Sequence, residues 1–427
     1  MSSGTVNEAI LIHFSGPDAP GITAGITGVL AAEGVGILDI GQAVVHEALA
    51  LGMLVEISAA TDYAALKAAL EQRAQALGLQ VQFRPIPARA VEHWLKGLRL
   101  EHTPGGFAHF IVTLLARQIT LQQIARVSGI VAAHGMNIDR VERLSGRLSG
   151  SATSSGAARA GDAENACVEL GVSGDAGREA GMHAEFLAAA EEQCIDIAFQ
   201  REGIFRRNRR LFAFDMDSTL IQAEVIDELA RLAGVGEDVA RITEAAMRGE
   251  LDFDQSFTRR VALLKGLPAE RVNSLLDKIP LAEGAERLIR TLKRLGYKTA
   301  ILSGGFNFFA RSLQQRLGID FIHSNELEIV DGVVTGRVIP PIVNGARKAA
   351  LLAEIAAREG ISLEQVVAVG DGANDIPMLN AAGMGIAYRA KPLVRQKAAQ
   401  SISRLGLDGL LYLIGLRDCD VERVGRS

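Results

Sequence analysis

Acidic and small polar residues follow three short apolar runs in the second half of the chain. Asp215 and Asp217 end the run in FAFDMDSTLIQ, Ser303 follows KTAIL, and Asp371 follows VVAVG, with Asp375 four residues later. Carboxylates that meet in one cleft resist ionisation unless a cation neutralises them. Hard cations such as Mg²⁺ prefer oxygen ligands. The pattern therefore predicts an Mg²⁺ site, provided that these segments converge.

The same residue types suit phosphoryl transfer. A carboxylate such as Asp215 can attack phosphorus and form an acyl phosphate that water then cleaves. Asp217, two residues on, can protonate the leaving oxygen and later deprotonate the water. The hydroxyl of Ser303, backbone N–H groups at Gly304 and the ammonium of Lys348 can hold the phosphoryl oxygens.

Apolar runs alternate with helical segments from residue 211 onward, which is typical of a parallel sheet covered by helices. The clearest strands are expected at 210–215, 298–303 and 366–371. Ligands in open α/β sheets bind at the carboxyl ends of the strands, so the polar residues should meet in one crevice.

Four motifs carry a family resemblance. DMDSTL, LSGG, Lys348 and GDGANDIPML occur in the order found in the haloacid dehalogenase-like phosphatases, and residues 211–410 resemble the members that act on phosphoserine. The resemblance implies an α/β fold with a Rossmann-like parallel sheet and a helical cap. Relatives that pump ions have Thr in place of the second aspartate, whereas Asp217 fits a phosphatase.

The resemblance also implies the role of each acidic residue. Asp215 would be the phosphorylated nucleophile and Asp217 the general acid/base. Mg²⁺ would be held by Asp215, the main-chain carbonyl of Asp217 and Asp371, with Asp375 supporting the metal site indirectly.

Residues 222–283 separate the first two motifs and read as mostly helical, which predicts a small cap that excludes water and selects the substrate. The resemblance implies that Glu224 contacts the substrate amino group and that Arg260 contacts its carboxylate, which a guanidinium can bind through two hydrogen bonds. The remaining substrate-contacting positions would be Met247, Phe253 and Asn374. The alternative is that Glu224 is only a first-turn helix residue and Arg260 only a solvated charge. Met247 and Phe253 could likewise be plain cap core.

An internal repeat occupies the first half of the chain. Residues 26–40, ITGVLAAEGVGILDI, align with 127–141, VSGIVAAHGMNIDRV, at an offset of 101. Each copy contains an apolar run, a helical segment ended by a glycine and later strands, which predicts a βαββαβ unit occurring twice. We expect these α+β domains at 1–90 and 100–200, followed by the phosphatase domain at 210–427.

The two repeats resemble ACT domains, which often bind amino acids between copies. GPDAPGITAGIT matches the strand-to-helix turn of that family, where Asp18 and Gly21 would receive a regulatory ligand such as free L-serine at a helix N-terminus. The second copy departs from the pattern, because the offset places Leu121 and Gln122 opposite Pro20 and Gly21. The alternative is a pair of modules that serve only to form a homodimer.

Two segments read as connectors. Residues 150–165, GSATSSGAARAGDAEN, are small and polar without periodicity, which predicts a mobile loop. The arginine-rich stretch REGIFRRNRR at 201–210 reads as a solvated linker.

Composition excludes several classes of protein. A formal net charge of -5 gives no excess of positive charge for nucleic acid. No leader and no apolar run long enough for a membrane span are recognised, so we expect a cytoplasmic protein. The cysteines, Cys167, Cys194 and Cys419, have no zinc or disulfide spacing.

Taken with the resemblance, these residues predict an Mg²⁺-dependent hydrolase that converts O-phospho-L-serine into L-serine and phosphate, the last step of serine biosynthesis. Two alternatives stay open. The substrate could be another small phosphomonoester, or the chain could be an amino-acid sensor whose catalytic half is vestigial.

Overall fold

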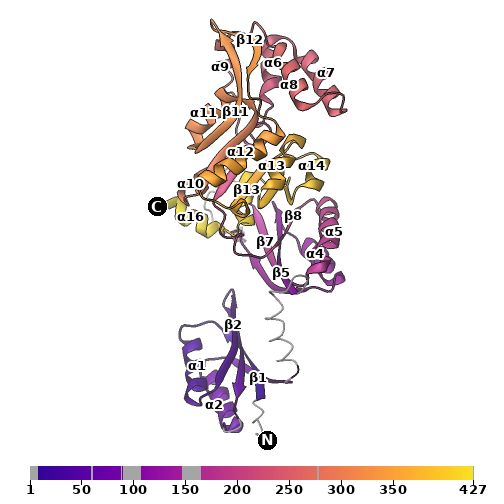
Figure 1. Cartoon of the computed structure of the whole chain (residues 1–427). Helices are drawn as coiled ribbons and strands as arrows, with labels where there is room; N and C mark the ends of the chain where they lie inside the picture. The colour runs from indigo at the N-terminus through magenta and orange to yellow at the C-terminus, as the bar shows by residue number, and fades with distance from the viewer. Residues whose placement is uncertain are drawn as a thin grey trace, which may run out of the picture. The chain divides into compact units, whose positions relative to one another are not determined.

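The computed structural model describes residues 8–58, 61–87, 89, 107–146, 165–276 and 278–426 (Figure 1). The chain divides into two compact units, Met1–Phe107 and Ala108–Ser427. The loop predicted at 150–165 lies outside the described residues except for Asn165. Among the described residues no helix combines the length and apolarity needed to cross a membrane.

The first unit contains one βαββαβ module, as predicted. Its elements are β1 (Glu8–Pro17), α1 (Ile22–Ala32), β2 (Gly36–Val45), β3 (Ala48–Ile57), α2 (Tyr63–Ala76) and β4 (Gln80–Ile86). The antiparallel sheet has the order β2-β3-β1-β4. Alternate residues of β3, including Leu51 and Met53, pack against Ile26 of α1 and Leu70 of α2.

The second unit begins with the second module, which is also βαββαβ. Its elements are β5 (Phe107–Ala116), α4 (Leu121–Ala133), β6 (Asn137–Arg143), β7 (Ala166–Asp175), α5 (Glu179–Glu192) and β8 (Asp196–Arg201). The sheet order, β6-β7-β5-β8, repeats that of the first module. Both copies of the predicted fold are therefore confirmed.

The two modules differ at the turn before the first helix. Gly21 is the N-cap of α1, whereas Thr120 is the N-cap of α4 and forms a capping box with Gln123. Leu121 and Gln122 are thus the first residues of the helix and do not occupy the positions of Pro20 and Gly21, so the constant offset is wrong at this turn. The last residues of the two helices match at the offset of 101, but α4 has 13 residues and α1 has 11, so α4 begins two residues earlier.

The second module packs on the domain that follows it. Nine of the ten residues of β7 are buried, because one face of this strand meets α4 and α5 and the other meets the catalytic domain. Cys167 of β7 belongs to the same apolar cluster as Phe212. The Asp196 carboxylate accepts hydrogen bonds from the backbone N–H groups of Ser403 (2.8 Å) and Arg404 (2.7 Å).

The segment 201–210 is not a purely solvated linker, so that prediction is wrong for two of its arginines. Arg206 is buried and pairs with the buried carboxylate of Glu169 in β7. Arg209 is also buried and donates to the main-chain oxygen of Glu364. A buried carboxylate requires a charged partner, and the arginine-rich stretch supplies one at the contact between module and catalytic domain.

A seven-stranded sheet forms the catalytic domain, in the order β12-β11-β10-β9-β13-β14-β15. These strands are β9 (Leu211–Phe214), β10 (Lys298–Phe306), β11 (Phe321–Val330), β12 (Val333–Ile339), β13 (Val366–Gly370), β14 (Met384–Tyr388) and β15 (Gln400–Ile402). The three predicted strands correspond to β9, β10 and β13, which are adjacent and parallel. Helices α10 (Ala285–Arg294), α11 (Asn307–Leu317), α12 (Gly345–Arg358) and α13 (Ile376–Ala381) cover the sheet.

The predicted cap is present between β9 and α10 and is mostly helical. It contains α6 (Val225–Ala233), α7 (Gly236–Met247), α8 (Phe253–Ala262) and α9 (Ala269–Asn273). Figure 1 shows α6, α7 and α8 grouped near the β11–β12 hairpin, and α8 contacts β12. The two strands that connect cap and core pair with each other at Ile221 and Leu281, and we call the segments 220–222 and 280–283 the neck.

Candidate active site

The carboxyl ends of β9, β10 and β13 meet at a cavity of about 770 Å³ between the catalytic core and the cap. The sequence-predicted residues that line it are Asp215, Asp217, Glu224, Met247, Phe253, Arg260, Ser303, Gly304, Asp371 and Asn374. Lys348 and Asp375 lie immediately behind it, in contact with Asp215 or with each other. The structure therefore brings together every predicted catalytic-domain residue.

Asp215 is held in place by its own strand end and by Lys348. Its backbone N–H donates to the carbonyl of Val369 in β13 (2.9 Å). The Lys348 ammonium, from the first turn of α12, lies 3.0 Å from Asp215 Oδ1 and 2.6 Å from Asp375 Oδ1. Lys348 is fully buried, and although burial lowers its pKa, the charges of Asp215 and Asp375 raise it above its ordinary value. The ammonium therefore stays charged between two carboxylates.

Three carboxylates form a cluster of the size that a metal ion requires. One oxygen from each of Asp215, Asp371 and Asp375 lies within 4.8 Å of the others. Burial, together with the charges of Asp215 and Asp375, raises the pKa of Asp371 to about 8. Burial and the charge of Asp215 likewise raise the pKa of Asp375 to about 6. Burial and the neighbouring negative charges make these carboxylates difficult to ionise. A hard divalent cation, which prefers oxygen ligands, would neutralise them.

Asp375 and Asp371 differ in their hydrogen-bond partners. Its Oδ1 receives the Lys348 ammonium and its Oδ2 accepts the backbone N–H of Gly372 (2.9 Å). Both oxygens therefore have protein partners. Asp371 instead receives one side-chain hydrogen bond, from the Thr219 hydroxyl (2.9 Å).

Asp217 occupies an apolar and acidic environment. Burial, followed by the charges of Glu224 and Asp215, raises the pKa of Asp217 well above its ordinary value. Its Oδ1 is buried without a hydrogen-bond partner. A raised pKa favours the protonated form of the carboxyl group, which is the form that can donate a proton.

At the glycine-rich end of β10, larger side chains would collide with neighbouring groups. A Cβ on Gly305 would lie 2.7 Å from Asp217 Oδ2, and one on Gly304 would lie 2.9 Å from the ring of Phe253. The Ser303 hydroxyl is fully buried and accepts the backbone N–H of Gly305 (2.9 Å). Without side chains at Gly304 and Gly305, the backbone there can approach a bound anion closely.

Glu224 and Arg260 place opposite charges on the cap side of the cavity. Glu224 is the N-cap of α6, and its Oε1 accepts the Ser218 hydroxyl (2.8 Å). Burial raises its pKa. Arg260, in the last turn of α8, has a pKa that burial lowers, with the charges of Asp227 and Glu224 opposing that effect. The Nε of Arg260 is buried without a hydrogen-bond partner.

The apolar cap residues differ in exposure. Phe253 is half-buried and stacks on Phe257, with ring centroids 5.7 Å apart. Met247 is 67% exposed, so it lies at the mouth of the cavity and not in a cap core. Its Sδ is 3.9 Å from the ammonium of Lys391, which follows β14.

Sequence reasoning missed three residues that support the site. Thr219 is fully buried beside Asp371, and its position within the DMDSTL motif was the available signal. Asn325 is a fully buried polar residue within β11 whose amide binds the Gly304 carbonyl (2.8 Å) and the Val343 N–H (2.7 Å). Lys391 lines the cavity, and it belongs to no recognised motif.

The positions predicted to bind a regulatory ligand lie in the first unit. Gly21 has φ 89°, a left-handed conformation that favours glycine. Asp18 is exposed, and its backbone N–H donates to the Glu47 carbonyl (2.7 Å).

The fold and the site together define a class. Residues 209–383 match the haloacid dehalogenase-like hydrolase family, and residues 8–84 match the ACT domain family. A HAD family hydrolase from Salmonella enterica serovar Typhi is 32% identical with a TM-score of 0.60, covering 71% of this chain and 99% of its own. The chain is therefore a haloacid dehalogenase-like enzyme with an N-terminal ACT domain.

Two relatives that match over nearly their full length identify the family within this class. "Phosphoserine phosphatase" of Streptomyces coelicolor is 41% identical over 99% of this chain and 96% of its own length. "Phosphoserine phosphatase SerB2" of Mycobacterium tuberculosis is 40% identical over 97% of this chain and 98% of its own length. The chain belongs to the phosphoserine phosphatase family, whose members are phosphoric monoester hydrolases.

Proposed function

We propose that this enzyme hydrolyses O-phospho-L-serine to L-serine and phosphate through a phosphoaspartate at Asp215. The observation that carries the proposal is the single cavity in which Asp215, Asp217, Glu224 and Arg260 face one another. The relatives named above support the choice of phosphoserine.

In the first half-reaction a carboxylate oxygen of Asp215 forms a bond to phosphorus, and the bond between phosphorus and the serine oxygen breaks. Asp217, whose pKa burial raises, gives a proton to the departing serine oxygen. In the second half-reaction Asp217 takes a proton from water, and the water oxygen bonds to phosphorus as the bond to Asp215 breaks.

The phosphoryl oxygens require positive or N–H groups on several sides. We expect Lys348, the Ser303 hydroxyl and the backbone at Gly304 to supply them; all three lie at or beside the cavity. Asp371, Asp215 and the main-chain carbonyl of Asp217 would hold Mg²⁺, with Asp375 supporting them through Lys348 and Gly372. When bound, the ion would neutralise the carboxylates and the phosphoryl charge.

Residues of the cap side would bind the ammonium and carboxylate groups of the substrate. A zwitterion that loses water under the cap requires an opposite charge for each of its own. Glu224 would pair with the ammonium and Arg260, through its unpartnered Nε, with the carboxylate. Phe253 and Met247 would cover the substrate, and Asn374 would contact it from the core side.

The test is phosphate release from O-phospho-L-serine by the full chain with and without Mg²⁺. Saturable release that depends on Mg²⁺ supports the proposal. If an unrelated small phosphomonoester reacts with a higher kcat/KM, the substrate assignment fails while the reaction type stands.

We also propose that the first module binds free L-serine near Asp18 and Gly21 and that the modules form a homodimer. The ACT family match and the left-handed Gly21 at the start of α1 support the first part.

A further inference from the structure

Glu283 lies at the end of the neck, two residues beyond the point where the cap's two connecting strands pair. The neck is held together by the hydrogen bonds from Gln222 N to Pro280 O (3.0 Å) and from Ala282 N to Leu220 O (2.8 Å). Any group that fixes Glu283 therefore also fixes one of the two segments that connect the cap to the core.

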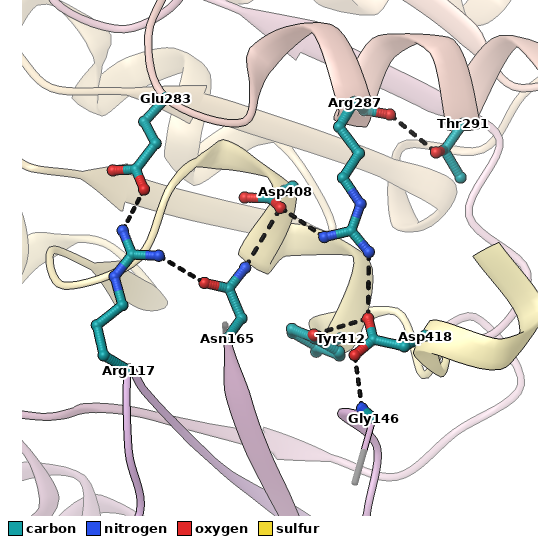
Figure 2. Close-up of polar contacts among 9 residues, drawn as sticks. All are labelled: Arg117, Gly146, Asn165, Glu283, Arg287, Thr291, Asp408, Tyr412 and Asp418. Carbon is teal, nitrogen blue, oxygen red and sulfur yellow. Dashed lines mark hydrogen bonds and ion pairs between the residues drawn. The ribbon is translucent and has the colours of Figure 1, made fainter. Parts of the chain in front are cut away.

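Three separate segments hold Glu283. Its Oε1 accepts the guanidinium of Arg117, which directly follows β5 of the second module (Figure 2). Its Oε2 accepts Arg389, which directly follows β14 (2.7 Å). Its carbonyl accepts the backbone N–H of Leu407 (2.7 Å). The next residue, Gly284, has φ 75° and no room for a Cβ beside Asp408.

Arg117 is held by a hydrogen-bond network that includes residues of both the second module and the catalytic domain. It donates to Asn165 (2.8 Å), which in turn donates to Asp408 (3.3 Å). Figure 2 shows Asp408 also accepting Arg287, at 2.8 Å. The guanidinium therefore reaches the neck from a defined network and not as a freely rotating surface side chain.

Arg389, the second partner of the Glu283 carboxylate, lies close in sequence to a residue at the mouth of the active site. Arg389 lies two residues before Lys391, whose ammonium contacts the cap residue Met247. Glu283 thus contacts the second module through Arg117 and the core segment after β14 through Arg389. The same core segment contacts the cap at Met247.

The exposure of these side chains indicates what the contact does. Arg117, Glu283 and Arg389 are 37%, 40% and 39% exposed. Ion pairs this exposed contribute little to stability. Their position beside the neck suits them to orient the cap instead, since a few residues at the ends of elements can set how one part of a protein is placed on another.

We propose that Arg117 and Glu283 are positioning residues through which the second module orients the cap for substrate binding. A neck without this contact samples more orientations, so a smaller fraction of molecules has the cap in the orientation that binds substrate. Apparent affinity falls in proportion to that fraction. The chemical step, carried by Asp215 and Asp217, is not altered.

The experiment compares full-length Arg117→Met and Glu283→Gln with wild type by amide hydrogen exchange without substrate and by steady-state kinetics. We expect faster exchange at Gln222 and Ala282 in both variants. For O-phospho-L-serine we expect KM to rise roughly 2- to 5-fold, the size typical of an exposed ion pair, with kcat changed by less than about 2-fold. The kinetic readout rests on the proposed substrate, whereas the exchange readout does not.

Two controls separate orientation from general loosening. Asp196→Asn weakens the same contact between module and catalytic domain at Ser403 and Arg404, away from the neck. Arg126→Met removes an exposed pair with Glu192 inside the module. Both should leave neck exchange and KM unchanged, and Arg117→Lys, which keeps the charge, should restore part of the loss. Unchanged neck exchange in Arg117→Met, or an equal effect of Asp196→Asn, would overturn the proposal.

Discussion

The ammonium of Lys348 lies 3.0 Å from Oδ1 of Asp215, and both groups are buried. The same oxygen also accepts the backbone N–H of Met216 (2.7 Å), so we expect the other carboxylate oxygen of Asp215 to attack. Four expectations about the variants and ligands of this enzyme follow from this site and from the first module.

Removing the acid/base group should slow turnover without preventing substrate binding. Asp217→Asn keeps the size of the side chain but cannot donate the proton to the leaving oxygen. We expect kcat for O-phospho-L-serine to fall by roughly 10²- to 10⁴-fold, measured by phosphate release. An aryl phosphate whose leaving group needs no proton should be affected less. Equal losses for both substrates would argue against an acid role.

Selectivity should depend on the charged pair of the cap. Arg260→Ala leaves the substrate carboxylate without its partner, which costs roughly 2 to 5 kcal/mol when a buried charged pair is broken. The loss should appear in kcat/KM for phosphoserine and far less for an aryl phosphate without amino or carboxylate groups. The ratio of the two kcat/KM values should fall in Glu224→Ala as well. A constant ratio in both variants would mean that neither residue reads the substrate.

Mg²⁺ should stabilise the protein through the carboxylate cluster. A ligand present at 100 times its Kd adds about 2.7 kcal/mol to the free energy of unfolding, so the Tm should rise by several degrees. Because the pKa of Asp371 is about 8 without metal, protons compete with the ion, and the rise in Tm should be larger at pH 8.5 than at pH 6. Asp371→Asn should abolish the rise. A shift that persists in this variant would place the ion elsewhere.

The first module should bind L-serine through the turn at Gly21. An alanine at this position is strained, because its backbone has φ 89°. Gly28→Ala is the matched control, since Gly28 lies inside α1 with open space around it. Calorimetry on the full chain should show heat with L-serine for wild type and Gly28→Ala, and a loss of it for Gly21→Ala. Identical titrations for all three proteins would argue against a serine site at Gly21 and favour modules that serve only to form a homodimer.

Local sequence patterns were sufficient to predict the strand ends that form the site. Asp215 and Asp371 each directly follow a buried strand, Ser303 lies in the last part of β10, and parallel strands bring their carboxyl ends to one edge of the sheet. The order of the motifs then predicted how Lys348 and Asp375 join them. The two βαββαβ modules were likewise predicted from apolar periodicity and from the glycines that end their helices.

Contacts between segments far apart in the chain could not be predicted in this way. Arg206 looked like part of a solvated linker because nothing in its own neighbourhood reveals the buried Glu169. Asn325 and Arg117 act on Gly304 and Glu283 across the fold, so neither has a local pattern. The turn before α4 was misaligned because a repeat with a constant offset cannot show that one helix is two residues longer.

The central claim is the covalent role of Asp215, and mass spectrometry after rapid acid quench with O-phospho-L-serine tests it most directly. The account predicts a phosphoryl group on the peptide containing Asp215 in wild type, and none, with turnover abolished, in Asp215→Asn. A correctly folded Asp215→Asn enzyme that still releases phosphate at the wild-type rate would contradict it.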